Sequence, residues 1–481
     1  MKQNSIDVDA FREIVGASFV KDDHESLTRY AVDGMAPGAV ILPGTVDQVS
    51  DVVRLAAARG LTMVPRGSGS KMAEGNPPTR LDLVIGTERL NRIVDMDTAN
   101  LTVTVEAGVR FMEVQAALGA QENRCYLPHE GPEAVAESAI CSERENRGCF
   151  IPLMPAFSDI ATMGGIIAAG SSGPTRLLYG LPRDLVLGVR YVDPEGAVLG
   201  MGGKTVKNVS GYDMSKLMIG SMGTLGILCE VTLRLLPLPE GAETCLFAFP
   251  DLGVARQFVD WIFETNLLPA AVELMNARAF DLLAPAALAD AGGNAYAVAV
   301  ALEGVREAVA RMHAETVARA TALGCTDPVL FQAGDHPSLW ERYGSLPSSL
   351  GQEFPDLISV RINYPISCYA EILEEVGSLS EKAGLDHVLI CQAGSGLARI
   401  HFPGTPGTDE QGERRGSVIQ RVLERCADLG GNLIVERARP ELKGVLPLWG
   451  RPRDDLIIMR RIKGELDPAG LFSPGRFVGG I

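Results

Sequence analysis

Residues 204–227 read KTVKNVSGYDMSKLMIGSMGTLGI, a stretch in which glycines interrupt apolar and hydroxyl-bearing residues. Its four glycines are Gly211, Gly220, Gly223 and Gly226. Because glycine reaches positive φ angles and lets the backbone approach a ligand closely, such clusters often line a cofactor. A second glycine-rich segment, Pro65-Arg66-Gly67-Ser68-Gly69-Ser70, lies far upstream, after a predicted strand at 61–64. Together the two segments predict the two halves of one binding site.

A third segment of the same kind runs from Pro155 to Gly173. Successive backbone N–H groups in glycine loops form concave sites that bind the charges of a pyrophosphate without lysines. Each segment alone is also compatible with a plain turn or the start of a helix. Two common nucleotide motifs are excluded, because a Rossmann fingerprint needs glycine at Met72 and a Walker A motif needs glycine at Val198.

These three segments, in this order, resemble the FAD site of the vanillyl-alcohol-oxidase/PCMH flavoprotein family, and residues 466–477 resemble its C-terminal signature. Residues 207–213 resemble, more narrowly, the E-type subunit of bacterial glycolate oxidases, which groups the chain with D-2-hydroxyacid dehydrogenase flavoproteins. The resemblance implies FAD as cofactor. It implies that FAD is bound by Pro65, Arg66, Gly67, Ser68, Gly69, Ser70, Pro155, Asp159, Thr162, Gly164, Gly165, Ser171, Gly173, Lys207, Gly211, Tyr212, Gly220, Gly223, Thr224, Gly226, Ile227 and Arg476.

Attachment of this FAD is expected to be non-covalent. Many relatives link FAD to a histidine in or just after the first glycine loop, whereas Gly69 is followed here by Ser70, Lys71 and Met72. His129 is the only other histidine in the expected FAD domain, and it lies in an apparent insertion.

Composition limits the class of protein. The chain has 481 residues, enough for roughly three domains, and a net charge of −16, which argues against partners that are nucleic acids or anionic membranes. We find no apolar run long enough for a transmembrane helix and no signal peptide, so we expect a cytoplasmic protein, with attachment to the inner membrane through a partner as an alternative. The nine cysteines are expected to be reduced.

We expect an α+β protein: a two-lobed PCMH-type FAD-binding domain, a ferredoxin-like α+β cap domain and a C-terminal helix. The expected segments are an N-terminal arm at 1–33, the FAD domain at 34–238 with an insertion at about 120–150, the cap at 239–450, and a tail at 451–481 that returns to the flavin. In the cap, helices are predicted at 254–265, 305–324, 369–384 and 413–430, and strands at 296–302, 357–364, 387–393, 398–402 and 432–437.

The cap departs from the relatives that oxidise D-2-hydroxy acids. Those carry two metal-ligating histidines in a motif that corresponds to residues 392–399, and a third histidine after a glutamate that also ligates the metal. Here Gln392, Arg399 and Arg437 stand at the histidine positions, and only Glu436 is kept. Since imidazoles are the ligands such a site needs, we expect no metal.

Arginines could replace the metal. Arg361, Arg399 and Arg437 lie in predicted strands and could form a cationic pocket for a small carboxylate substrate, because guanidinium binds carboxylate in a bidentate manner. Alternatively they are surface arginines. His401 is a candidate base near the flavin, with a purely structural role as the alternative.

Two functions therefore stay open. The first is an FAD-dependent oxidoreductase of the glycolate/D-lactate oxidase type, which transfers hydride from a 2-hydroxy acid to flavin N5 and passes electrons to a partner protein. The second is a catalytically decayed flavoprotein subunit that relays electrons or scaffolds a complex. The chain has neither iron–sulfur nor nicotinamide motifs, so the resemblance implies an iron–sulfur subunit and a second flavoprotein subunit as partners.

Overall fold

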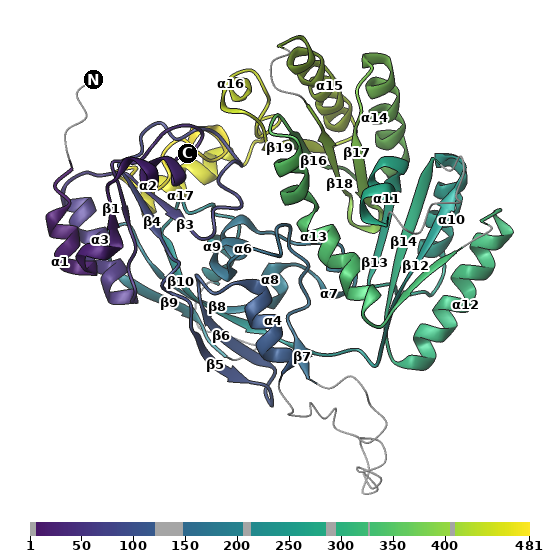
Figure 1. The fold of residues 1–481 in the computed structure, drawn as a ribbon, viewed down its shortest axis with the longest axis horizontal. Helices are drawn as coiled ribbons and strands as arrows, with labels where there is room; N and C mark the ends of the chain where they lie inside the picture. The colour runs from purple at the N-terminus through teal and green to yellow at the C-terminus, as the bar shows by residue number, and fades with distance from the viewer. Residues whose placement is uncertain (1–5, 121–147, 205–212, 285–294, 326–327, 405–408) are drawn as a thin grey trace, which may run out of the picture.

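The computed structural model describes residues 6–120, 148–204, 213–284, 295–325, 328–404 and 409–481. The chain forms two bodies that lie side by side (Figure 1). The first holds a four-stranded and a five-stranded sheet, and the second is built on one eight-stranded sheet, which we call the cap sheet. The expected boundaries at 34, 239 and 451 stay predictions, and most of the expected insertion lies outside the described residues.

The four-stranded sheet delivers the first glycine loop. Its order is β1 (Val20–Lys21), β2 (Ala39–Ile41), β4 (Leu83–Gly86), β3 (Met63–Arg66), and β2, β4 and β3 run parallel. The helix between β2 and β3 is α3 (Val46–Ala58), whose cap residue Thr45 accepts a hydrogen bond from the backbone N–H of Gln48 at 3.1 Å. Because β3 ends at Arg66, the chain leaves the sheet directly into the glycine loop.

The five-stranded sheet is antiparallel and supports the other two glycine segments. Its order is β5 (Ile93–Asp97), β6 (Thr102–Glu106), β10 (Ile227–Arg234), β8 (Val186–Val192), β9 (Val198–Gly202). Helices α4 (Phe111–Gly119) and α6 (Met163–Ala169) contribute to the apolar core on this sheet. The remaining short elements of this body are α1 (Asp9–Val15), α2 (His24–Arg29), β7 (Cys149–Phe150), α7 (Arg176–Tyr179), α8 (Pro182–Leu185), α9 (Ser215–Met218) and β11 (Leu236–Pro237).

The cap sheet joins two ferredoxin-like units edge to edge. The first unit runs β12 (Gly241–Phe249), α10 (Leu252–Glu264), β13 (Ala271–Asn276), β14 (Tyr296–Gly304), α12 (Arg306–Ala322), β15 (Val329–Gln332). The second runs β16 (Ile358–Asn363), α14 (Tyr369–Ala383), β17 (Val388–Gln392), β18 (Leu397–Phe402), α15 (Asp409–Asp428), β19 (Asn432–Arg437). Antiparallel pairing of β13 with β17 joins them into the order β15-β12-β14-β13-β17-β18-β16-β19.

The two faces of the cap sheet have different coverings. Helices α10, α12, α14 and α15 bury one face in a large apolar core. The other face is packed by α11 (Ala277–Leu283) and α13 (Asp335–Glu353) and looks toward the first body. The four outer helices were predicted from the sequence, whereas β12, β13, β15, α11 and α13 were not.

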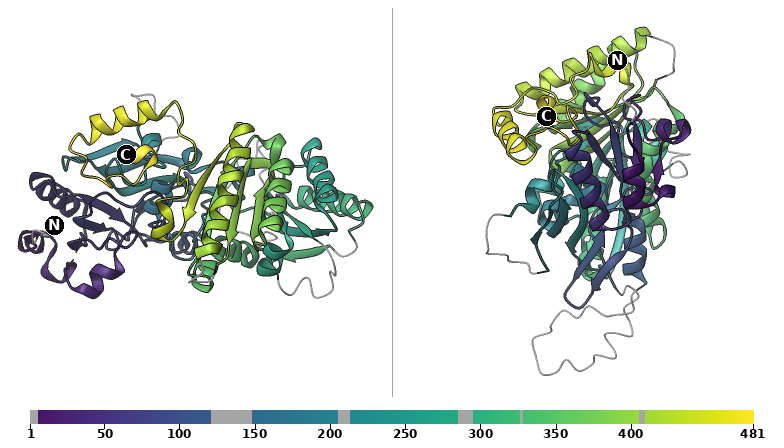
Figure 2. Two further views of the ribbon diagram at one scale, coloured as in Figure 1. Left: turned by 90° about the horizontal axis from the view of Figure 1, so that it is seen from above. Right: turned by 90° about the vertical axis from the view of Figure 1, so that its left-hand side faces the viewer.

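The C-terminal tail returns to the first body, as Figure 2 shows for the yellow segment beside the purple one. After α16 (Pro440–Lys443) and α17 (Leu456–Leu466), the chain pairs with β3. The backbone N–H of Met63 donates to the carbonyl of Leu471 at 2.7 Å, and that of Ser473 donates to the carbonyl of Met63 at 2.8 Å. The tail therefore lies next to the strand that leads into the first glycine loop.

Candidate flavin and substrate site

A cleft in the first body brings the three glycine segments together. The predicted residues that border it are Pro65, Arg66, Gly67, Ser68, Gly69, Ser70, Thr162, Gly164, Gly165, Gly223, Gly226, Ile227 and Arg476. Lys71, Met72, Thr87, Ala107, Ala168, Ala169, Ser221, Met222 and Leu228 also border it and were not predicted. Pro155, Asp159, Ser171, Gly173, Gly220 and Thr224 do not border it. Lys207, Gly211 and Tyr212 lie outside the described residues.

The glycines of the cleft are required by close packing. A Cβ atom on Gly67 would lie 2.2 Å from Oγ1 of Thr162, the residue that caps α6, and Gly69 has a φ of +87°. A Cβ on Gly164 would lie 2.6 Å from the Cβ of Ala107. Side chains at these positions would push the loop and α6 apart, so glycine keeps the cleft walls close together.

The polar atoms around the cleft fit an anionic ligand rich in hydrogen-bonding groups. Within the described ranges, Oγ of Ser221 and Nε of Arg476 are buried and have no hydrogen-bond partner. Buried polar groups are normally paired, so these atoms have capacity left for a ligand. With the hydroxyls of Ser68 and Ser70 and the glycine backbone, they make a donor set suited to the pyrophosphate of FAD.

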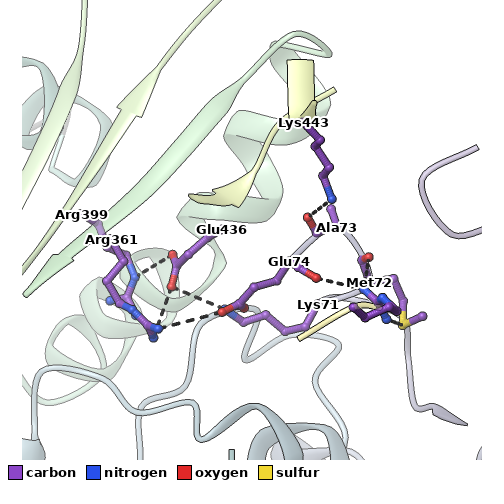
Figure 3. Close-up of polar contacts among 9 residues, drawn as sticks. Lys71, Met72, Ala73, Glu74, Arg361, Arg399, Glu436 and Lys443 are labelled. Atoms are coloured by element: carbon purple, nitrogen blue, oxygen red, sulfur yellow. Dashed lines mark hydrogen bonds and ion pairs between the residues drawn. The ribbon is translucent and has the colours of Figure 1, made fainter. Parts of the chain in front are cut away.

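Residues 72–75, which follow the first glycine loop closely in the chain, are held by two basic side chains. Arg476 of the tail donates through Nη2 to the carbonyls of Met72 and Glu74, at 2.7 and 2.9 Å. Lys443 of α16 is buried and donates to the carbonyl oxygen of Ala73 at 2.7 Å (Figure 3). It also donates to the carbonyl oxygen of Gly75 at 2.9 Å and to Asp33 at 2.8 Å. Arg476 was predicted from the sequence and Lys443 was not, because the only sequence signal for Lys443 is its position in a short helix that begins with Pro-Glu.

A charge cluster connects this loop to the cap sheet (Figure 3). Arg361 of β16 and Arg399 of β18 are directly opposite each other, so their side chains share one face, and both reach the carboxylate of Glu436. The distances are 3.2 Å from Nε of Arg399 and 3.6 Å from Nη1 of Arg361. Lys71 lies between Glu436, at 3.8 Å, and Glu74, at 3.1 Å.

Glu436 remains ionised in this setting. Burial by itself would raise its pKa, but the charges of Lys71, Arg399 and Arg361 hold the pKa of Glu436 well below its usual range. Three cations, Lys71, Arg361 and Arg399, face the two carboxylates of Glu436 and Glu74. A fourth, Arg176 of α7, has its pKa lowered by burial and by the charges of Arg399 and Arg361. The region therefore carries a surplus of positive charge in a protein of net charge −16.

Arg437 and His401 have other partners. A bulge between Ser359 and Val360 turns Arg437 toward α13, where its Nη2 donates to the carbonyl of Gly351 at 3.2 Å. Of the three arginines expected to converge, two meet at Glu436 and Arg437 lies apart. Nδ1 of His401 is 2.8 Å from Oγ of Ser359, and burial lowers the pKa of His401 to about 4, so the ring is neutral at pH 7.

Beside Arg399 lies a buried polar group that sequence reasoning missed. Glu273 of β13 is fully buried, and its Oε2 accepts a hydrogen bond from the hydroxyl of Tyr343 on α13 at 2.8 Å. Burial raises the pKa of Glu273 to about 8. Tyr343, Arg399 and His401 border a cavity of about 20 Å³, room for about one water-sized group. The sequence signal that could have revealed this group is the single carboxylate, Glu273, within the otherwise apolar run at 271–275.

One cluster of mixed metal-ligand types occurs in the described part of the chain: Glu243, Cys245 and His313, whose ligand atoms lie within 4.8 Å of one another. Cys245 belongs to the core between the cap sheet and helices α10, α12, α14 and α15, on the opposite face of the sheet from Arg399. It is thus separate from the cleft. The expectation of no metal at Gln392, Arg399 and Arg437 stays a prediction.

Two protein-family models match the chain: the FAD binding domain over residues 37–142 and 139–202, and the C-terminal domain of FAD linked oxidases over residues 238–477. Among curated proteins, the D-2-hydroxyglutarate dehydrogenase of Xanthomonas citri pv. viticola is 29% identical, over 97% of this chain and 96% of that protein. The glycolate oxidase subunit GlcD of Bacillus subtilis is 27% identical, over 92% and 88%. The D-lactate dehydrogenase of Archaeoglobus fulgidus is 26% identical, over 91% of each chain.

Solved structures show the same fold. p-Cresol methylhydroxylase superposes with a TM-score of 0.72 at 16% identity, covering 99% of this chain and 97% of that chain, and 4-ethylphenol oxidase from Gulosibacter chungangensis with 0.71 at 18%, covering 98% and 96%. The predicted fold class, PCMH-type with an α+β cap, is confirmed. No helix in the described ranges is long and apolar enough to cross a membrane. The chain therefore belongs to the FAD linked oxidases, with an FAD binding domain, and is an FAD-dependent oxidoreductase of the type that includes glycolate oxidase and the D-lactate and D-2-hydroxyglutarate dehydrogenases.

Proposed function

We propose that the protein oxidises a small 2-hydroxy acid, with Arg399 and Arg361 binding the substrate carboxylate where relatives use a metal. The observation that carries this proposal is the position of the two arginines, which lie side by side and share the carboxylate of Glu436 with Lys71, a residue that borders the cleft. The surplus of positive charge around Glu436 favours an anionic ligand there, because local charges act more strongly than distant, screened ones.

The chain's own residues would bind and orient the reactants. The cleft residues would hold FAD without a covalent bond, and Arg476 and Lys443 would keep the loop at 72–75 in place behind it. When bound, FAD supplies the acceptor for the hydride that leaves the substrate Cα. The arginines would fix the substrate carboxylate, and thereby the direction of the Cα–H bond, while the cap sheet and α13 exclude water.

We further propose that electrons leave through partner proteins. The glycolate oxidase relative is named a subunit, and the present chain is expected to act beside an iron–sulfur subunit and a second flavoprotein subunit. The narrower assignment to E-type subunits rests on residues 207–213, almost all of which lie outside the described ranges. Affinity purification of the chain from its native host, followed by identification of stoichiometric partners, tests this part.

Anaerobic mixing of the FAD-loaded protein with glycolate, D-lactate or D-2-hydroxyglutarate tests the catalytic part. Bleaching of the flavin absorption band by one of them is the expected result. If none bleaches the band while dithionite does, the alternative holds, namely a catalytically decayed subunit that relays electrons or scaffolds a complex. The loss of all three histidines from the metal motifs favours that alternative.

A further inference from the structure

We propose that Glu273 and Tyr343 form a proton-accepting pair that takes up the substrate hydroxyl proton, with Tyr343 touching the substrate and Glu273 acting through it. This inference rests on the proposed function, because it assigns a base to the oxidation of a 2-hydroxy acid. It replaces the candidate His401, whose Nδ1 is already engaged with Ser359.

Glu273 and Tyr343 lie next to Arg399, one of the two arginines proposed to bind the substrate carboxylate. Glu273 of β13 and Gln392 of β17 are opposite each other on the cap-sheet face that looks toward the first body. Tyr343 reaches down from α13, donates to Oε2 of Glu273 at 2.8 Å and accepts from Nε2 of Gln392 at 3.4 Å. The same tyrosine borders the small cavity together with Arg399. That cavity has room for about one water-sized group, enough for the hydroxyl group of a substrate whose carboxylate binds Arg399 from outside the cavity, and this hydroxyl would then lie near Tyr343.

Glu273 has spare capacity to bind a proton. It is fully buried, and in the described part of the chain its Oε1 has no hydrogen-bond partner. Burial raises the pKa of Glu273 to about 8, against the lowering effects of the Tyr343 hydrogen bond and of the charges of Arg399 and Arg176. The other titratable groups that sense its charge, Tyr364 and Cys391, are themselves buried with raised pKa values and stay neutral. A base with a pKa near the working pH is the most effective kind.

The step balances. The O–H bond of the substrate breaks and its proton passes to the hydroxyl oxygen of Tyr343, as the proton of Tyr343 passes to Oε2 of Glu273. The Cα–H bond breaks at the same time, and its electron pair leaves with the hydride to FAD. The C–O bond becomes a C=O bond, so the products are a 2-oxo acid, the two-electron-reduced cofactor and protonated Glu273. Loss of that proton to solvent resets the pair.

The variants Glu273→Gln and Tyr343→Phe test this proposal, with Glu303→Gln as a matched control. Glu303 is also buried, lies on the same sheet face and accepts a tyrosine hydroxyl, that of Tyr179, but it borders a different cavity. Infrared spectra of the FAD-loaded protein should show a carboxylic acid C=O band that titrates near pH 8 in the wild type and in Glu303→Gln. That band should be missing in Glu273→Gln.

Stopped-flow reduction with the active 2-hydroxy acid gives the second readout. In Glu273→Gln and Tyr343→Phe, the limiting rate of flavin reduction by the substrate should fall by about 100-fold or more. In the wild type this rate should rise as the pH approaches about 8, and in the two variants it should not. Photochemical reduction of the bound flavin should stay normal in both. An unchanged rate and pH profile in Glu273→Gln, with an active wild type, overturns the inference alone. A wild type that no 2-hydroxy acid reduces overturns the proposed function, and the pair then has no catalytic role.

Discussion

The Nζ atom of Lys71 lies 3.8 Å from Oε1 of Glu436, so the residue that follows the first glycine loop is paired with a strand of the cap sheet. Lys71 borders the flavin cleft, and Glu436 holds the two arginines proposed to bind substrate. Changes at Glu436 should therefore affect both bodies.

Replacement of Glu436 by Gln should destabilise the protein at neutral pH. It would leave Arg399 buried without its carboxylate partner, and we expect a loss of up to about 3 kcal/mol in the free energy of unfolding, less than for a fully buried pair because Lys71 and Arg361 are partly exposed. Urea denaturation at pH 7 measures this, with the exposed Glu441→Gln as control. Equal stability of the two variants would show that the ion pairs contribute little.

The pH dependence at Glu436 has a defined sign. Its pKa in the folded state is lowered, so its contribution to stability is complete above the unfolded-state pKa of about 4.3 and is lost as the pH falls below that value. The wild type should thus lose stability in acid more steeply than Glu436→Gln, when denaturation is followed from neutral pH down to about pH 3. Parallel curves for the two proteins would contradict this assignment.

Replacement of Arg399 by Met should weaken binding of carboxylate ligands. Loss of a buried charged hydrogen bond corresponds to about 2 kcal/mol, or roughly a 30-fold increase in Kd. Titration with oxalate, followed by shifts of the flavin absorption spectrum, measures this, and Arg256→Met on the exposed side of α10 serves as control. Flavin content should stay the same in both variants. A Kd equal to that of the wild type would exclude Arg399 from the ligand site.

Replacement of Gly67 by Ala should impair FAD binding. The added Cβ would lie 2.2 Å from Oγ1 of Thr162, and this hydroxyl cannot move freely because it caps α6 through the N–H of Gly165. Such overpacking costs about 1–3 kcal/mol. The ratio of flavin to protein after purification should fall, whereas Gly200→Ala, which meets nothing within 4 Å, should keep full flavin content. Full loading of Gly67→Ala would mean that the loop adapts.

Acid precipitation should release the flavin. No histidine stands in or just after the first glycine loop, where Gly69 is followed by Ser70 and Lys71. Yellow colour in the supernatant after precipitation, measured against a protein with histidine-linked flavin treated in the same way, is the expected result. Flavin that stays with the precipitate would demonstrate a covalent bond to another residue.

The sequence was most informative where the function depends on the backbone. The segments at 65–70 and 155–173 could be recognised because close approach of main chain requires glycine at set spacings, and the structure brings Gly67 next to Thr162 across the cleft. The outer cap helices were also predicted, because each carries a one-sided apolar stripe that faces one core. The tail's return to the cleft followed from the family signature.

The missed elements are those whose local sequence conflicts with their structure. Helix α13 contains Pro347 and Gly344, which normally argue against a helix, yet tertiary packing of its buried residues maintains it. Strand β13 is buried on both faces and carries Glu273 within an apolar run, so it lacks the alternation that marks a strand. Tyr343 and Glu273 lie on these two elements, and the pair therefore went unseen.

By itself the sequence determined the cofactor class, the glycine-lined cleft and the replacement of the metal-ligating histidines by Gln392, Arg399 and Arg437. Only the tertiary structure decided which charges meet: that Arg361 and Arg399 share Glu436 with Lys71, and that Arg437 turns away at a bulge. The physical reason is the separation along the chain over which each effect acts. Glycine spacing and apolar periodicity act between neighbours in the chain, whereas an ion pair or a shifted pKa depends on burial and on partners supplied by distant strands and helices.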